Sequence, residues 1–206
     1  MSKISILIAD DHKIVRMGLK SLFAAEKDLV VVGEADDGDL TVRQALQLSP
    51  DIIIMDLMMP KMDGVAATAE IHAKLPKTRI VVLTSYSTSD TIAAALAAGA
   101  AGAIMKSADD STLLTAVRSV AAGKKFISPE VKGLLAFDPP APTLSPRQQE
   151  VLVSLAKGFN NNEIANQLGI SKTVAKEHVE TLLVKLDAAN RTEAVAIALR
   201  KQLVKI

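Results

Sequence analysis

Over its first 123 residues the chain alternates short apolar runs with segments of helical periodicity, and no other feature restricts its fold as strongly. The strand-like runs are Ile4–Ala9, Leu29–Ala35, Asp51–Met55, Ile80–Thr84 and Ala103–Met105. The helical patterns are Ile14–Ala25, Leu40–Leu48, Val65–Leu75, Thr91–Ala98 and Ser111–Ala121. Continuous apolar runs of this length are typical of strands covered on both faces. The alternation therefore predicts an α/β fold, a doubly wound five-stranded parallel sheet.

The alternation stops after Gly123, where prolines become frequent. Half of the eight prolines of the chain are Pro129, Pro139, Pro140 and Pro142. They predict a linker over residues 124–143, in which Lys132–Phe137 is compatible with a short helix. Residues 144–206 have helical patterns throughout. We therefore expect one domain over residues 1–123, the linker, and an all-α four-helix domain over residues 144–206.

Helix starts are indicated by hydroxyl or amide side chains that can cap a first turn. In the first domain, a carboxylate three residues later marks Ser87 and Ser107 as such starts. The four helices of the second domain are expected to start at Ser145, Asn160–Asn162, Ser171 and Asn190.

The composition narrows the classes of protein to consider. The net charge is only +1, which gives no overall basic field, although residues 144–206 carry 9 Lys and Arg against 6 Asp and Glu. The absence of Cys excludes disulfides, thiolate metal sites and cysteine nucleophiles. The longest apolar stretch, Ile92–Met105, has 14 residues, too few for a membrane span, and the N-terminus has no secretory signal. We expect a cytoplasmic protein without membrane contact.

Acidic side chains come directly after two of the predicted strands. Asp10 and Asp11 follow the first strand, and Asp56 follows the third. With the strand order 2-1-3-4-5 these strands are neighbours, and such sheets bind ligands beyond the carboxyl ends of their strands. Three converging carboxylates need a cation, because like charges at close range disfavour ionisation. A hard divalent ion, most simply Mg²⁺, is the expected occupant.

Two further groups should reach the same edge of the sheet, because Thr84 ends the fourth strand and Lys106 follows the fifth. A metal pocket with a hydroxyl and an ammonium suits phosphoryl transfer, in which positioning and charge neutralisation supply most of the catalysis. Asp56 is the best candidate for a carboxylate nucleophile, and the backbone carbonyl of Met58 can complete the metal shell.

These residues resemble the receiver domain of two-component response regulators. The matching segments are Asp10–Asp11, Met55–Pro60, Asp63–Gly64, Thr84–Ser85 and Ala98–Lys106. The resemblance implies a flavodoxin-like sheet and phosphorylation of Asp56 by a sensor histidine kinase. It implies that Mg²⁺ is bound by Asp11, Asp56 and the Met58 carbonyl, with Asp10 assisting through water. It further implies that Thr84 and Lys106 engage the phosphoryl group.

One position departs from the pattern of that family. Receiver domains commonly carry an aromatic switch residue three positions before the lysine, and this chain has Ala103 there. The usual coupled movement of hydroxyl and ring therefore cannot operate. Tyr86, the sole tyrosine, is a candidate substitute, and a loop tyrosine without that role is the alternative.

The second domain resembles the LuxR-type helix-turn-helix of the FixJ/NarL group. The resemblance runs through Leu144–Leu152, Lys157–Gly158, Asn162–Ala165, Leu168–Ser171, Lys176, His178–Val179, Leu182–Leu183, Lys185–Leu186 and Asn190–Val195. It implies DNA binding, with two copies pairing on a two-fold DNA site.

The third helix of that domain is the second helix of the helix-turn-helix motif and therefore the expected recognition helix. The amino-terminal residues of a recognition helix reach base edges. The expected DNA-contacting residues are Lys172, Thr173, Lys176, His178 and Lys185. A packed structural role is the alternative for His178. Glu177 and Glu180 lie on the same expected face, where carboxylates repel phosphates.

The sequence thus predicts a response regulator, phosphorylated on Asp56 without turnover of an external substrate, that regulates transcription as a dimer on DNA. The alternatives are a protein of this fold that acts without phosphorylation, and one that binds a protein partner in place of DNA. An aspartate-dependent phosphatase is disfavoured because Met58 stands where its second carboxylate would be. A flavin protein is disfavoured because carboxylates occupy the place of the flavin phosphate.

Overall fold

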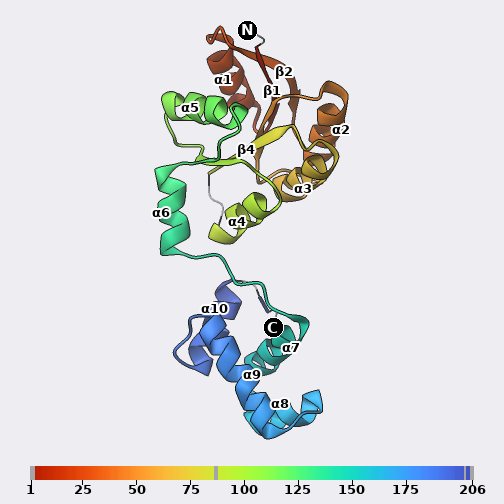
Figure 1. Ribbon diagram of the computed structural model, residues 1–206, viewed down its shortest axis with the longest axis vertical. Helices are drawn as coiled ribbons and strands as arrows, with labels where there is room; N and C mark the ends of the chain where they lie inside the picture. The colour runs from red at the N-terminus through yellow and green to blue at the C-terminus, as the bar shows by residue number, and fades with distance from the viewer. Residues whose placement is uncertain (1–2, 86–87, 202, 205–206) are drawn as a thin grey trace. The chain divides into compact units, whose positions relative to one another are not determined.

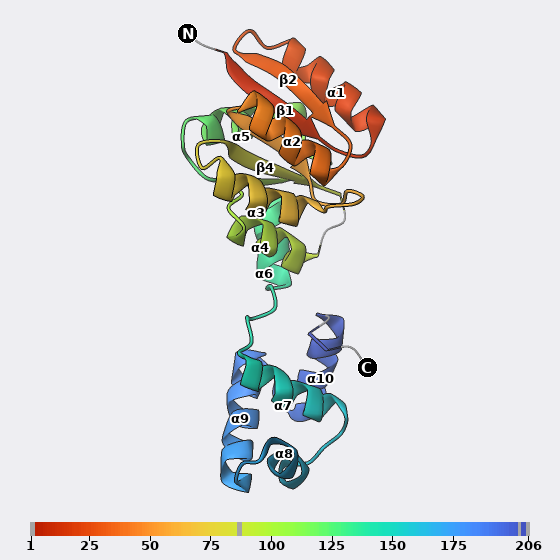
Figure 2. The same ribbon diagram turned by 90° about the vertical axis from the view of Figure 1, so that its right-hand side faces the viewer.

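The computed structural model describes residues 3–85, 88–201 and 203–204, and the chain divides after Pro139 into two compact units (Figures 1 and 2). The strands are β1 (Ile4–Ala9), β2 (Leu29–Ala35), β3 (Ile52–Asp56), β4 (Arg79–Thr84), β5 (Gly102–Met105) and β6 (Phe126–Ile127). The helices of the first unit are α1 (Lys13–Ala24), α2 (Gly38–Leu48), α3 (Gly64–Lys74), α4 (Ser89–Ala97), α5 (Asp110–Ala121) and α6 (Pro129–Phe137). Those of the second unit are α7 (Pro146–Ala156), α8 (Asn161–Leu168), α9 (Lys172–Lys185) and α10 (Arg191–Arg200).

Within the described residues, the strands of the first unit form one parallel sheet in the order β2-β1-β3-β4-β5-β6. The doubly wound parallel fold and the order of its first five strands are confirmed. The expected count of five strands is wrong, because Phe126 and Ile127 pair with Gly102 and Ala103 and extend the sheet by a sixth strand.

Helices cover both faces of this sheet, as Figures 1 and 2 show. One apolar cluster lies under α1 and α5 and includes Phe23 and Val117, which are fully buried. The other lies under α2, α3, α4 and α6, and Ile71 and Ile92 are among its fully buried helical members. Helices therefore cover both faces of the sheet, and the carboxyl ends of its strands are open to a ligand.

Residues 124–139, most of the expected linker, belong to the first unit. Val131 of α6 is fully buried in the same cluster as Ala103, and Leu134 and Leu135 pack against that cluster. Ser89 Oγ, at the start of α4, donates a hydrogen bond of 2.7 Å to Asp138 Oδ2. The linker prediction over residues 124–143 is thus wrong for its first part, and the segment between α6 and α7, residues 138–145, contains neither helix nor strand.

The second unit is a four-helix arrangement around its own core, with Leu152, Ile164, Leu182 and Ala198 fully buried. The starts of its helices are confirmed, because the side chains of Ser145, Asn160, Ser171 and Asn190 each cap a first turn. Between α8 and α9 the chain turns at Gly169, whose φ of +63° lies in the left-handed region that glycine adopts without strain.

Helix starts in the first unit differ from the prediction. The helix α5 is capped by Asp109, whose Oδ1 accepts from the Thr112 amide at 2.7 Å, and not by Ser107. Thr88 caps α4, and the predicted cap Ser87 lies outside the described residues. None of the helices in the described part of the chain is long and apolar enough to cross a membrane.

Candidate functional site

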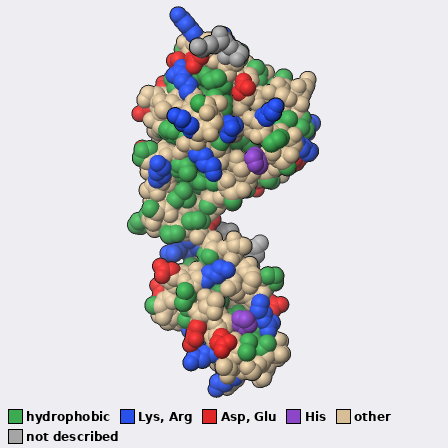
Figure 3. Space-filling view, viewed as in Figure 1, with side chains coloured by type: hydrophobic (Ala, Val, Ile, Leu, Met, Phe, Trp, Pro, Cys, Tyr) green, Lys and Arg blue, Asp and Glu red, His purple; other side chains and the backbone are tan. Residues whose placement is uncertain are grey.

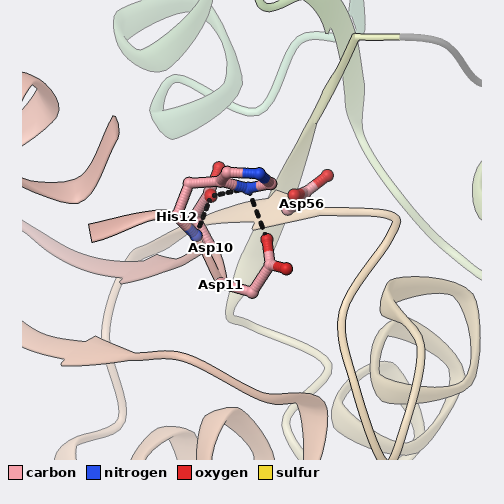
Figure 4. A group of neighbouring side chains, drawn as sticks. All are labelled: Asp10, Asp11, His12 and Asp56. Atoms are coloured by element: carbon pink, nitrogen blue, oxygen red, sulfur yellow. Dashed lines mark hydrogen bonds and ion pairs between the residues drawn. The ribbon is translucent and has the colours of Figure 1, made fainter. Parts of the chain in front are cut away.

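The carboxylates of Asp10 and Asp56 lie side by side at the carboxyl edge of the sheet. The register pairs Ala9 of β1 with Met55 of β3. Each of these two residues is followed by an aspartate, Asp10 or Asp56. Both side chains are nearly inaccessible to solvent, at 2% and 4% exposure. Figure 4 shows how they converge with Asp11 and His12 from the β1–α1 turn. The predicted convergence of the three carboxylates is therefore what the structure has.

Lys106 joins the two buried carboxylates. Its Nζ lies 2.6 Å from Asp10 Oδ2 and donates to Asp56 Oδ2 at 2.7 Å. The Lys106 amide donates to the Thr84 carbonyl at 2.8 Å, which holds the chain after β5 against the end of β4. The parallel pairing of β4 and β5 thus delivers the ammonium to aspartates that lie two and three strands away along the sheet.

One ammonium does not offset the charge of two buried carboxylates. Burial raises the pKa of Asp56 above its usual 3.8, and the neighbouring Asp10 charge adds to the rise; the hydrogen bond from Lys106 opposes both. Burial also acts to lower the pKa of Lys106, but its hydrogen bonds to Asp10 and Asp56 raise the pKa overall. The site therefore favours binding of further positive charge next to Asp56.

His12 is a member of the site that the sequence did not identify. Its Nδ1 lies 2.6 Å from Asp11 Oδ1 and 3.4 Å from Asp10 Oδ1, and its backbone amide donates to Asp10 Oδ1 at 2.8 Å. Asp10, Asp11, His12 and Asp56 each offer a potential ligand atom within 4.8 Å of the others. Three carboxylates and an imidazole form a donor set that suits a divalent cation. Adjacency to Asp11 was the available signal for His12.

The loop after β3 is shaped by close contacts around Asp56. The amide of Met58 donates to Asp56 Oδ1 at 3.2 Å, and the Met58 side chain is exposed. A Cβ added at Gly64 would lie 2.1 Å from the Asp56 carbonyl oxygen, so glycine alone permits this approach. Asp63 caps α3 by accepting from the Ala66 amide. The side chain of Thr84 is buried at the end of β4, on the same edge of the sheet.

The position of the missing aromatic residue is filled by another element. Ala103 is fully buried in β5, and β6 and α6 supply Ile127, Val131 and Leu134 to the apolar cluster around it. Ala103 thus lies in the same apolar cluster as the buried residue of α6, Val131. Tyr86, the candidate substitute for the aromatic switch, lies outside the described residues.

The expected DNA contacts of the second unit lie on α9. The side chains of Lys172, Thr173 and Lys176 are exposed, and His178 is half-buried. Lys185 is exposed at the end of the helix, where its Nζ donates to Gln148 Oε1 at 2.9 Å. Four of the five side chains are thus accessible to a ligand.

A hollow of about 580 Å³ borders α9 on one side. Lys172, Lys176, Glu180 and Arg191 supply its charged lining, and Asn160–Asn162 supply amides from the start of α8. Glu177 and Glu180 are both exposed, and Lys176 Nζ lies 3.6 Å from Glu180 Oε1. Figure 3 shows acidic and basic side chains intermixed on the visible face of the second unit.

Two family models match the chain. The model described as a response regulator receiver domain matches residues 6–118. The model described as bacterial regulatory proteins of the luxR family matches residues 142–198.

Full-length relatives have the same organisation. The transcriptional regulatory protein LiaR of Bacillus subtilis is 37% identical over 209 residues, which cover 98% of this chain and 99% of the relative. The response regulator protein VraR of Staphylococcus epidermidis is 36% identical over 211 residues, with coverage of 98% and 99%.

Solved structures of response regulators also align with nearly the whole chain. RcsB of Salmonella typhimurium aligns with a TM-score of 0.76 at 29% identity, covering 94% of this chain and 98% of that one. An RcsB–DNA complex aligns with a TM-score of 0.69 at 28% identity, covering 97% and 99%.

Proposed function

Because the chain belongs to the response regulators that join a receiver domain to a LuxR-type DNA-binding domain, we propose that phosphorylation of Asp56 by a sensor histidine kinase controls its binding to promoter DNA. The observation that carries the proposal is the buried group of Asp10, Asp56 and Lys106, in which one ammonium contacts both carboxylates. Such a group has no evident use in a protein that only binds DNA.

The residues present fit Mg²⁺. The carboxylates are hard oxygen donors, they offer ligand atoms within 4.8 Å of one another and of His12, and burial raises the pKa of Asp56, an effect that a bound cation would oppose. Asp11, Asp56 and the Met58 carbonyl would hold the ion, with Asp10 acting through water. The ion would neutralise charge that builds up on the phosphoryl oxygens.

The chain's own residues would carry out the transfer as follows. A carboxylate oxygen of Asp56 forms a bond to phosphorus as the P–N bond of a phosphohistidine breaks, and the released imidazole nitrogen keeps the electron pair and takes up a proton. The ammonium of Lys106, already 2.7 Å from Asp56 Oδ2, would then pair with the transferred phosphoryl group. The hydroxyl of Thr84 would bind another phosphoryl oxygen from the end of β4.

Control of DNA binding requires that the phosphoryl group favour one conformation of the first unit over another. The DNA-binding surface would be the exposed side of α9 with Lys172, Thr173 and Lys176, and His178 and Lys185 would contact the backbone. A homodimer on a two-fold site is supported by a related structure, described as two RcsB dimers bound to two parallel DNAs.

A second candidate function is binding of a protein partner in place of DNA. Glu177 and Glu180 favour it, because exposed carboxylates on α9 repel phosphates.

The test of phosphorylation is to incubate the full chain with Mg²⁺ and a small acyl phosphate and to measure the intact mass. We expect one phosphoryl group on the wild-type chain and on the control Asp110→Asn, and none on Asp56→Asn. The same preparations are then used to capture genomic DNA fragments at fixed salt. Enrichment of specific fragments only with the phosphodonor supports the switch, equal enrichment in both states indicates an unswitched DNA binder, and no enrichment supports the protein partner.

A further inference from the structure

The charge pair on α9 suggests which bases the second unit reads. The buried side of α9 carries Ala175, Val179 and Leu182, and Lys176, Glu177 and Glu180, the fifth, sixth and ninth of its 14 residues, lie on the remaining, exposed surface. In a helix-turn-helix the second helix lies in the major groove, with its exposed side towards the DNA. Carboxylates at these positions must therefore meet base edges or phosphates when DNA is bound.

A carboxylate in the major groove strongly restricts the sequence that it can face. It accepts hydrogen bonds but donates none, and its desolvation is costly unless a donor replaces the lost water. Guanine presents two acceptors, thymine an acceptor and a methyl group, and adenine a donor next to an acceptor. Cytosine alone presents the N4 amino donor without an acceptor on the same base.

Lys176, the ion-pair partner of Glu180, supplies a hydrogen-bond donor beside the carboxylate. Lys176 Nζ lies 3.6 Å from Glu180 Oε1, one helical turn away, and both side chains are mainly exposed, at 66% and 60%. The pair thus presents a donor and an acceptor side by side. A C·G base pair presents the opposite array, the cytosine N4 donor next to the guanine O6 and N7 acceptors.

We propose that the Lys176–Glu180 pair reads one C·G base pair in each half-site, with Glu180 accepting from cytosine N4 and Lys176 donating to guanine. The proposal rests on the proposed DNA binding and deepens it. It turns the carboxylate from a feature that opposes DNA binding into one that rejects wrong sequences, because guanine and thymine offer it no donor and adenine places an acceptor beside its donor.

The experiment is selection of binding sites from a randomised DNA pool by the full-length chain, with Mg²⁺ and phosphodonor, followed by affinity measurements on the selected site. For the wild-type chain we expect an invariant C·G pair in each half-site, and a loss of about tenfold or more when it is replaced. For Glu180→Gln we expect adenine at that position, because an amide matches the adjacent donor and acceptor of adenine. Affinity of Glu180→Gln for random DNA should also rise, because one negative charge is removed.

Glu177→Gln is the matched control, since it removes an equal charge from the same exposed surface. It should keep the C·G preference. If Glu177→Gln changes the selected base and Glu180→Gln does not, the assignment to the Lys176–Glu180 pair is overturned.

The salt dependence of binding separates this inference from the proposed function. Salt-sensitive binding by the wild-type chain without any C·G position overturns the inference alone. If the wild-type chain binds no DNA in either phosphorylation state, the proposed DNA binding fails, and the inference fails with it.

Discussion

Three functional side chains of the first unit are buried and contact one another, whereas most of the side chains expected to contact DNA in the second unit are exposed. Asp10, Asp56 and Lys106 are at most 13% exposed, and contacts of 2.6 and 2.7 Å link them. On α9 the charged side chains Lys176 and Glu180 are at least 60% exposed, and their separation is 3.6 Å. The two halves of one regulator thus hold their functional groups in different ways.

The difference follows from the solvent around each site. A buried charge must find a partner within the protein, so the position of one residue restricts that of the next. An exposed charge is satisfied by water and acquires a fixed position only when a ligand displaces that water. The first site is therefore organised before any ligand arrives, and we expect the second to become organised on DNA.

The largest expected effect tests whether α6 belongs to the organised first unit. Val131→Asp places an unpaired carboxylate in the core cluster around Ala103, and we expect the first unit to lose about 3–5 kcal/mol of stability, as for an uncompensated buried charge. Hydrogen exchange followed by mass spectrometry separates peptides of the two units. Phe137→Asp, at a side chain that is 91% exposed on the same helix, is the control and should change stability by at most about 0.5 kcal/mol. Equal effects of the two substitutions would show that α6 does not pack on the first unit.

An intermediate effect is expected from the buried carboxylates of Asp10 and Asp56, which lower the stability of the folded chain. Asp56→Asn removes one of two buried carboxylates that share a single ammonium, so we expect it to stabilise the chain by about 0.5–2 kcal/mol at pH 7, the usual range for a stabilising substitution. Thermal unfolding without divalent ions measures this difference. Destabilisation at pH 7 would contradict the charge imbalance inferred here.

The same pair of proteins should show a defined pH dependence. Because the pKa of Asp56 is raised on folding, the folded chain binds that proton more readily than the unfolded chain, and its contribution to stability is complete below the usual pKa of 3.8. That contribution is lost as the pH rises through the raised pKa. The stability difference between Asp56→Asn and the wild-type chain should therefore shrink as the pH is lowered from 7 towards 4.

The smallest expected effect concerns the exposed cations of the second unit. Lys172→Ala should leave the unfolding temperature unchanged and reduce the slope of log K against log salt by about 0.9 if Lys172 contacts one phosphate. Lys185→Ala should change the slope less, because its Nζ already donates to Gln148 Oε1. The measurement is a salt titration of binding to random DNA. A larger change in the slope for Lys185→Ala than for Lys172→Ala would show that Lys185 contributes more to phosphate binding, contrary to this prediction.

The comparison also explains what could be predicted from the sequence. The positions of the first five strands along the chain, and of Asp10, Asp11 and Asp56 at strand ends, followed from hydrophobic patterns, whereas the strand order was assumed and agrees with the resemblance to receiver domains. The strand β6 could not be predicted, because two residues carry no periodicity and their pairing with Gly102 and Ala103 is a tertiary contact. His12 was missed because its role depends on a side-chain contact with Asp11.

Local signals that compete with one another account for the remaining differences. Prolines over residues 129–142 indicated a linker, yet Pro129 is the first residue of α6, a position where proline is favourable. Ser107 and Asp109 are both capable caps, and the structure uses Asp109, which accepts hydrogen bonds from both the Thr112 amide and the Ser111 hydroxyl.

The packing of β6 and α6 on the first unit has a consequence for the exchange of modules between regulators. A chimaera joined after Gly123 would lack β6 and α6. The cluster around Ala103 would then lose Val131, and the outer edge of β5 would have no neighbouring strand. A junction within residues 140–144 would transfer the first unit with its complete core and the second unit with its helix cap at Ser145. The natural place for recombination in this chain is therefore the short proline-rich segment after α6.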